Sequence, residues 1–326
     1  MKMEAGRILV IGAGVNGSVC AAGLHRNGVD VTLLARGERC GAIKREGVII
    51  EDPLKGTRSM TPVRVIDALR PDDIYDFVLV TVRKNQATDL LPVLAKNRSP
   101  NVVFMLNNPS GPEEWISALD KERVMQGFAF AGGKRDGQIV RAMRIKGLST
   151  PFGELDGSKT ERLLRLVAIL RGCGFNARAS TVMTDWLATH AALVAAIGML
   201  TIAHGCDTRE LGHSRHDLRL LVDACREALD VLRANGRRIV PASQNVIRWL
   251  PRSAIVIGLR ALLSTRVGEI GLGWHCSQAA DEIHELAREV LVLADTSGLP
   301  VPALRKVLAP AVCGPGGQAQ PPPADR

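Results

Sequence analysis

The 326-residue chain is poor in aromatic residues, which make up 3% of it, and it contains no run of five or more basic residues. Its formal net charge is nevertheless +9, because arginines are spread along the chain, often beside Asp or Glu, as in DKERV and ELARE. Nucleic-acid binders combine a basic patch with aromatic platforms for base stacking. The positive charge therefore favours an anionic small ligand and no nucleic acid.

Paired cysteines and long apolar runs are also missing. The seven cysteines are irregularly spaced, with no C-x-x-C pair, which favours free thiols in a reducing compartment. His204 with Cys206, and His275 with Cys276, lack the second pair of ligands that zinc needs, so we expect no metal. The most apolar run, 191–203, is shorter than the roughly 20 residues of a membrane span. We expect a cytoplasmic protein with this helix in its core or at a homodimer interface, and no membrane segment.

The pattern of apolar segments predicts two domains. Buried strands alternate with helices along the first half of the chain, which is typical of a doubly wound α/β domain. The expected strands are RILVIGA (7–13), VDVTLLAR (29–36), YDFVLVTV (75–82), NVVFML (101–106) and RVMQGFAFAG (123–132). We therefore predict a Rossmann-type domain over 1–180, an all-helical domain over 181–310 and a disordered tail over 311–326 that is rich in Gly and Pro.

Other segments receive more local predictions. Apolar spacing predicts an amphipathic helix over 158–174. Nearly all residues from 184 to 308 are expected to be helical, in a bundle of helices. Further expectations are a short helix and a hairpin-like excursion from 41 onward, a helix over 86–97, exposed antiparallel strands over 138–147 and 148–155, and an edge strand over 176–181.

A G-x-G-x-x-G motif follows the first predicted strand and opens a helix. In this context Gly12 permits a tight turn, Gly14 lets the backbone approach a diphosphate, and Gly17 lets helix and strand pack closely. The helix N-terminus adds N–H groups and a positive dipole for the phosphates. We expect this turn, including Val15 and Asn16, to bind a dinucleotide.

The end of the second strand indicates which dinucleotide. NAD-binding proteins carry an acidic residue there for the ribose hydroxyls. This chain has LLARGER, with Arg36 at that place and Arg39 nearby. A guanidinium pairs well with a 2′-phosphate, so we predict NADP(H); the alternative for Arg36 is a solvated loop arginine.

Together these residues resemble the ketopantoate reductases (2-dehydropantoate 2-reductases), within the wider 6-phosphogluconate dehydrogenase-like superfamily. The likeness rests on RILVIGAGVNGS, LLAR, VLVTVRKNQ, VFMLNNPSGPEE and the late DEIHEL and SGLPVPAL segments. It implies NADPH-dependent reduction of a 2-oxo acid by a Rossmann domain and a helical domain, with the active site in the cleft between them.

The resemblance also implies roles for single residues. Arg83 occupies the place of the family's lysine in T-V-K-x-x-Q, with Gln86 as its last residue, and we expect both to lie near the cofactor. Asn108 matches the asparagine of L-x-N-G and would bind nicotinamide or substrate, or cap a helix. Glu282 matches a glutamate that holds the substrate hydroxyl, unless it is a solvated helix residue. Ser277 is a candidate for the substrate carboxylate.

One family feature is missing. The catalytic lysine follows Trp186 by two residues in the family, and here that position is Ala188; Ala192 and Ala196 replace two asparagines. His190 lies one turn after Trp186 and could supply the proton, with a core histidine as the alternative. Lys84, Arg83 or water are further candidates for this role.

Three functions follow from these residues. The first is an NADPH-dependent 2-oxo acid reductase, with ketopantoate or a related acid as substrate. The second is an NADP(H)-binding sensor or pseudoenzyme, which the loss of the lysine favours. The third is another chemistry of the superfamily, on hydroxy acids, opines or imines.

Overall fold

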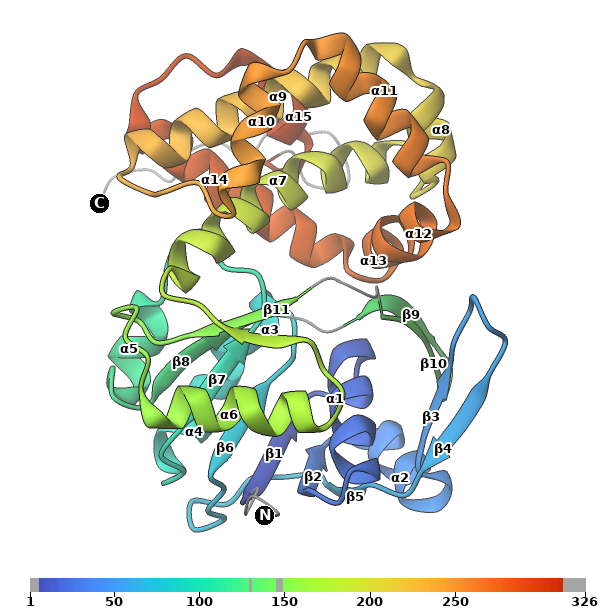
Figure 1. Ribbon diagram of the computed structural model, residues 1–326, viewed down its shortest axis with the longest axis vertical. Coiled ribbons are helices and arrows are strands. Elements are labelled where there is room, and N and C mark those ends of the chain that lie inside the picture. Colours follow the sequence, from blue (N-terminus) through green and yellow to red (C-terminus); the bar gives the residue numbers. More distant parts are fainter. Residues whose placement is uncertain (1–5, 129–130, 145–148, 313–326) are drawn as a thin grey trace, which may run out of the picture. The chain divides into compact units, whose positions relative to one another are not determined.

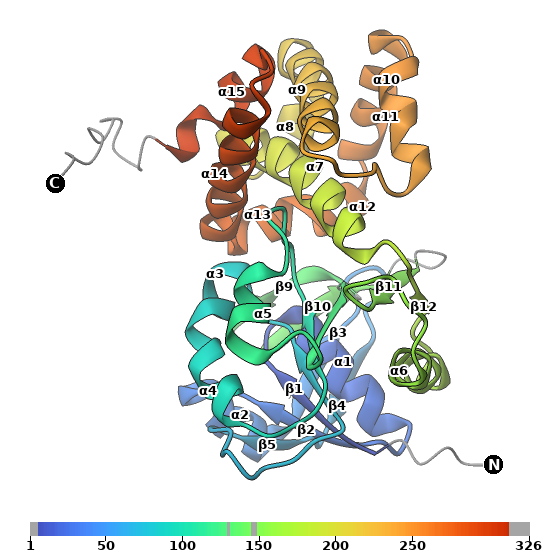
Figure 2. The ribbon, with the colours of Figure 1, turned by 90° about the vertical axis from the view of Figure 1, so that its left-hand side faces the viewer.

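The computed structural model describes residues 6–128, 131–144 and 149–312. These residues fall in two compact units, and the division along the chain lies between Thr184 and Asp185. We call them the cofactor unit and the helical unit and describe each by itself (Figures 1 and 2).

The cofactor unit is built on an eight-stranded sheet in the order β12-β11-β8-β7-β6-β1-β2-β5. Six neighbouring strands, from β8 to β5, are parallel, whereas β11 runs antiparallel to β8. The strands are β1 Arg7–Ile11, β2 Asp30–Leu34, β5 Arg64–Ile66, β6 Phe77–Val80, β7 Val102–Met105, β8 Val124–Gly127, β11 Thr150–Gly153 and β12 Ala177–Ala179. The chain order reverses direction across the sheet between β1 and β6, which is where α/β sheets of this kind bind ligands.

Apolar residues on both sides of each strand explain why this sheet is buried on two faces. In β1, Ile8 and Val10 pack into one core cluster, while Leu9 and Ile11 pack into the other. Helices α1 (Val15–Arg26) and α6 (Glu161–Gly172) belong to the first cluster, and α4 (Leu91–Lys96) and α5 (Glu113–Leu119) to the second. The Rossmann-type fold predicted from the sequence is confirmed.

The helix predicted over 86–97 is instead divided into three pieces. These are α3 (Lys84–Ala87), a 3₁₀ turn (Thr88–Leu90) and α4, which carries Pro92 in its first turn. Proline has no N–H to donate to the preceding turn, so α4 starts there.

A second sheet of four strands lies beside α1 and shares its core (Figure 1). Helix α2 (Gly37–Glu46) leads into the hairpin of β3 (Val48–Glu51) and β4 (Arg58–Thr61), which confirms the predicted excursion. Strand β3 also pairs in parallel with β10 (Ile139–Met143), which forms a hairpin with β9 (Gly132–Asp136). The strand predicted as exposed over 148–155 is wrong in this respect, because β11 is buried beside β8 in the main sheet.

The helical unit confirms the prediction for 184–308, and its described residues, which end at 312, form helices and connecting segments. The helices are α7 Met183–Ala203, α8 Thr208–His213, α9 Arg215–Ala234, α10 Val246–Trp249, α11 Arg252–Leu263, α12 Arg266–Gly268, α13 Trp274–Gln278, α14 Ala280–Ser297 and α15 Pro302–Leu308. A single π-helical segment, Glu269–Gly273, separates α12 from α13 in this part of the chain. The predicted tail falls mostly outside the described residues, although Ala311 ends a 3₁₀ turn and is buried.

Helix α7 contributes small side chains to the apolar core of the helical unit. It is long and apolar enough to cross a membrane by length and composition alone, with a mean hydropathy of 1.7 in its most apolar window. However, 61% of that window is buried inside the protein, as in the core helix of a folded unit. Its small residues pack with α9 and α14 in one apolar cluster: Ala188, Ala191, Ala192, Ala195 and Ala196.

Candidate active site

The three glycines after β1 serve three different purposes. Gly12 adopts φ +106°, a conformation that favours glycine, and so turns the chain out of the strand. A Cβ on Gly17 would lie 1.8 Å from the carbonyl oxygen of Gly12, so only glycine permits this close packing of α1. A Cβ on Gly14, in contrast, would meet nothing within 4 Å. The open space at Gly14 is the place where a diphosphate can approach the backbone.

The start of α1 favours an anion in that space. Gly14 is the N-cap and no acidic residue occupies the first turn, so the N–H groups of that turn face no carboxylate from their own helix. Val15 is the first helical residue. The side-chain oxygen of Asn16 accepts a hydrogen bond from the Ala131 backbone at 3.0 Å, so this side chain attaches the segment after β8 to the helix start.

Thr81 fastens the end of β6 to the same turn. Its hydroxyl lies 2.9 Å from the carbonyl oxygen of Ile11, to which it donates, and 3.2 Å from that of Gly12. The sequence patterns above do not predict this role of Thr81. The signal that indicates it is the place of Thr81 directly after a buried parallel strand, which brings it to the carboxyl edge where β1 also ends.

Beyond Thr81, a cation and an amide from neighbouring strand ends meet. Lys84 Nζ donates to Asn108 Oδ1 at 3.0 Å, and the Asn108 side chain is buried. Asn108 follows β7 and also contacts the backbone of Gly111, so its orientation is fixed on two sides. Arg83 is the N-cap of α3, and Gln86 accepts from the Arg83 backbone N–H at 3.4 Å. Lys84 thus contacts Asn108. It is the residue after Arg83, which the resemblance placed near the cofactor.

The two arginines after β2 differ in environment. Arg36 is exposed at the N-cap of α2. Arg39 is buried, and its Nη1 donates to the backbone and side-chain oxygens of Gln138 at 2.8 and 3.0 Å. Burial, with a smaller effect of the Arg135 charge, lowers the pKa of Arg39. Arg39 thus links α2 to the β9–β10 turn, and Arg36 is the exposed cation at this strand end.

In the helical unit, Ala188, at the position where the resemblance implies a lysine, lies in the apolar core. Ala188 is 1% exposed within the cluster of α7, α9 and α14. His190, two residues later, stacks on Trp186 with 5.1 Å between ring centroids and 7° between planes. Burial, with a smaller effect of the His275 charge, lowers the pKa of His190 to about 4. His190 is therefore a neutral imidazole near pH 7. It can make hydrogen bonds, but it carries no positive charge.

Glu282 lies in the first turn of α14, and its side chain is 5% exposed. Its Oε2 is 3.9 Å from Nε2 of His275 on α13. The structure thus brings Glu282 next to His275, a residue that sequence reasoning considered only as a metal ligand. Ser277 is exposed, and its hydroxyl donates to the Trp274 carbonyl oxygen of its own helix at 3.0 Å.

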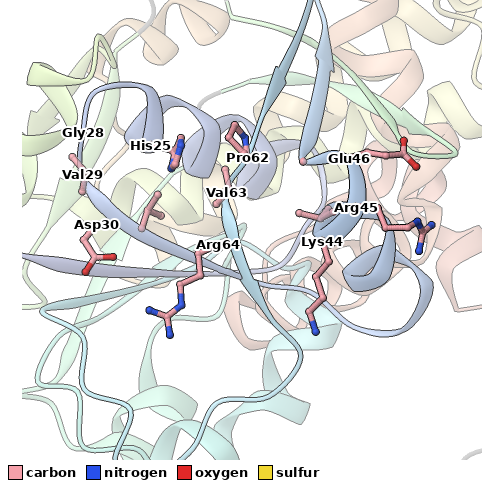
Figure 3. A pocket seen from close by; sticks show the side chains of 13 residues that line it. His25, Gly28, Val29, Asp30, Lys44, Arg45, Glu46, Pro62, Val63 and Arg64 are labelled. Atoms are coloured by element: carbon pink, nitrogen blue, oxygen red, sulfur yellow. The ribbon is translucent and has the colours of Figure 1, made fainter.

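Two other features lie outside these groups. Among the described residues, no set of three or more His, Cys, Asp or Glu side chains is arranged to hold a metal ion. A cavity of about 690 Å³ opens at the start of β2, at the opposite end of the strand from Arg36 (Figure 3). Its walls come from the last turns of α1 and α2 and from the segment that leads into β5, so it is separate from the glycine turn.

Comparison with known proteins agrees with this architecture. Residues 8–157 match the sequence profile of the family described as ketopantoate reductase PanE/ApbA. A 2-dehydropantoate 2-reductase of Archaeoglobus fulgidus is 28% identical over 244 residues, which cover 74% of this chain and 79% of that protein. The uncharacterised oxidoreductase YkpB of Bacillus subtilis is 27% identical over 170 residues, which cover 51% of this chain and only 54% of that protein.

Solved structures share the whole fold. D-mandelate dehydrogenase, solved with NADH and anilino(oxo)acetate, superposes with a TM-score of 0.76 at 16% identity and covers 94% of this chain and 97% of its own. At this identity the likeness concerns the fold. The resemblance to the ketopantoate reductases that the sequence indicated is confirmed by the family match over residues 8–157 and by the likeness to the Archaeoglobus fulgidus protein.

Proposed function

We propose that this protein is an NADPH-dependent reductase of a 2-oxo acid, ketopantoate or a close relative, and that it acts in the cytoplasm. The observation that carries the proposal is the open glycine turn at the switch point of the parallel sheet, with Lys84 and Asn108 at the ends of the adjacent strands. The likeness to a 2-dehydropantoate 2-reductase supports the substrate class.

The residues of the cofactor unit fit a dinucleotide phosphate. The backbone around Gly14 and the first turn of α1 would hold the diphosphate. No atom lies within 4 Å of the place where a Gly14 Cβ would be, and the first turn of the helix carries no acidic residue. The exposed guanidinium of Arg36 would pair with a 2′-phosphate, which is the basis for proposing NADPH over NADH. When bound, NADPH supplies a hydride to the carbonyl carbon of the substrate.

The chain's own groups would handle the rest of the reaction. Arg83 and Lys84 provide positive charge for the carboxylate of a 2-oxo acid, and Asn108, oriented by Lys84 and Gly111, can donate to a carbonyl oxygen. Gln86 supports Arg83 by capping α3. From the helical unit, we propose Glu282 and Ser277 for substrate binding and His190 as a neutral hydrogen-bonding partner of the reacting oxygen.

A second function is favoured by one observation. Ala188 is packed in the apolar core, so the helix position at which the family carries its lysine supplies no acid here. A protein that binds NADPH without turnover, as a sensor or pseudoenzyme, is therefore the competing proposal. The two differ in whether hydride leaves the cofactor.

The test is NADPH consumption by the purified chain with ketopantoate and a panel of other 2-oxo acids, with NADH run in parallel. We expect saturable turnover of at least one 2-oxo acid and a higher kcat/KM with NADPH. Tight NADPH binding without turnover of any acid in the panel would favour the sensor. A chain that binds neither nucleotide would refute both proposals.

A further inference from the structure

Exposed apolar side chains gather on α10 and α11 of the helical unit. Trp249 is 81% exposed and Ile257 is 69% exposed. The other large apolar residues that are exposed in this stretch are Val246, Leu250 and Leu262. Exposed apolar side chains that occur singly are ordinary on a soluble protein, whereas a group of them in one place is typical of an interaction surface.

Helix α11 is apolar on both of its sides, although only one side is covered. Val256 and Leu263 are buried and belong to the apolar core cluster of the unit. On the other side, exposed residues follow one another at helical spacing and form a single stripe, which we call the α11 stripe: Ala254, Ile257, Gly258, Ala261 and Leu262. A helix that is apolar all round is normally buried all round. The α11 stripe has no covering element among the residues that the structure describes.

The corner between α10 and α11 is ordered, so the exposed side chains stand on a fixed backbone. Arg226 of α9 donates from Nε to the Ile247 carbonyl oxygen at 2.9 Å and from Nη2 to that of Leu250 at 2.6 Å. These two bonds hold the backbone on both sides of Trp249. Figure 2 shows α10 and α11 together at one edge of the helical unit, beside α9. A surface that is already ordered loses little conformational freedom when it binds a partner.

Most charges next to this surface are neutralised within the chain. Arg248 Nη1 lies 2.7 Å from Asp230 Oδ1, and Arg252 Nε lies 3.1 Å from Asp223 Oδ1. Both carboxylates belong to α9. Arginines that already have acidic partners have less charge to offer an anionic membrane or an acidic protein. An apolar surface with a neutralised rim instead fits a partner that is itself apolar and neutral.

The area of this surface is close to what a stable dimer needs. The exposed apolar side chains of α10 and the α11 stripe offer on the order of 700 Å² per chain, of which Trp249 contributes about 200 Å². A specific interface of standard size buries about 800 Å² on each partner. The apolar surface therefore provides most of one such interface, and the polar side chains around it can supply the remainder.

We propose that two copies of this chain associate through α10 and α11, around a two-fold axis near Gly258. A two-fold axis brings the same surface of both copies together, so the surface must be complementary to itself. The α11 stripe meets this condition because it has both an open space and a side chain to fill it. A Cβ on Gly258 would meet no atom within 4 Å, and the neighbouring Ile257 is exposed. Ile257 of each copy packs against Gly258 of the other. The proposal does not depend on the proposed reaction.

The test is the molar mass of the purified full chain in solution, measured by analytical ultracentrifugation over a range of concentrations. We expect a dimer with twice the 35.0 kDa of one chain. Ile257→Asp should raise the dissociation constant of this dimer by at least about 30-fold, because it places two like charges in an apolar interface. Gly258→Gln should act in the same way, because its side chain occupies the space that Ile257 of the other copy needs. Val292→Asp is the matched control: it changes a 63% exposed apolar residue of α14 and should leave the dimer intact.

Thermal melts separate a loss of association from a loss of folding. Ile257→Asp and Gly258→Gln change exposed positions, so both variants should still unfold in one cooperative transition. A wild type that is monomeric at every concentration up to about 100 μM would overturn the proposal, as would a dimer that both substitutions leave intact. A monomer that sediments with vesicles of phosphatidylserine and phosphatidylcholine, and no longer does so after Trp249→Ala, would assign the surface to lipid and also refute the dimer.

Discussion

Arg36 and Arg39 lie three residues apart, yet the fold gives their guanidinium groups different surroundings. Arg39 lies on the buried face of α2 and bonds to Gln138, which stands about a hundred residues later in the chain. Arg36 precedes the helix and stays exposed. The sequence predicts a cationic strand end, but it cannot separate the two side chains, because the partner of Arg39 comes from a distant hairpin.

This difference gives a prediction for cofactor choice. Arg36→Ala should weaken NADPH binding by about 10–100-fold, since a hydrogen bond to a charged group contributes about 1.5–3 kcal/mol. NADH, which has no 2′-phosphate, should bind as before. Titration calorimetry with both nucleotides measures this.

Arg45→Ala is the matched control, because Arg45 is an exposed arginine in the last turn of the same helix and its removal changes the net charge equally. Equal losses for NADPH and NADH in the Arg36 variant, or equal losses in both variants, would show that Arg36 does not read the phosphate.

At the scale of elements, the β1–α1 turn is determined by neighbours in sequence. Its strand, turn and helix follow from the apolar run and the glycine spacing, and the structure agrees with each. Elements that depend on distant partners were less predictable. The pairing of β3 with β10 and the burial of β11 beside β8 each join segments that no local pattern connects. The same holds for the candidate site. The sequence predicted its glycines and its strand-end residues, whereas the Lys84–Asn108 and His275–Glu282 contacts are visible only in the folded structure.

The turn makes a prediction that separates folding from binding. Gly14→Ala should leave thermal stability nearly unchanged, because the new methyl group meets no atom within 4 Å, but it should weaken NADPH binding by at least about tenfold by occupying the diphosphate's space. Gly17→Ala should lower the free energy of unfolding by about 2 kcal/mol or more, because its methyl group would collide with the Gly12 carbonyl. Thermal melts with and without NADPH measure both effects. If Gly14→Ala still gains the full wild-type shift in Tm, the turn does not hold the diphosphate.

At the scale of the whole molecule, the chain divides its chemistry between two units. The cofactor unit carries the whole of the family match, over residues 8–157, and the features that fit a dinucleotide. The helical unit shares its fold with solved structures such as D-mandelate dehydrogenase, and within it His275 of α13 lies 3.9 Å from Glu282 of α14. The general fold was predictable because periodicity and strand alternation extend over the whole chain. The contact between His275 and Glu282 was not, since it depends on which side chains the helices bring together.

In the proposed reaction, hydride passes from NADPH to the carbonyl carbon of a 2-oxo acid. The most direct measurement is to incubate the wild-type chain with a 2-oxo acid and NADPH carrying deuterium at both C4 positions, and to analyse the product by mass spectrometry. We expect a 2-hydroxy acid with one deuterium on the carbon that bears the hydroxyl group. Oxidation of the cofactor without deuterium in the product, or no product from any 2-oxo acid despite bound NADPH, would contradict it.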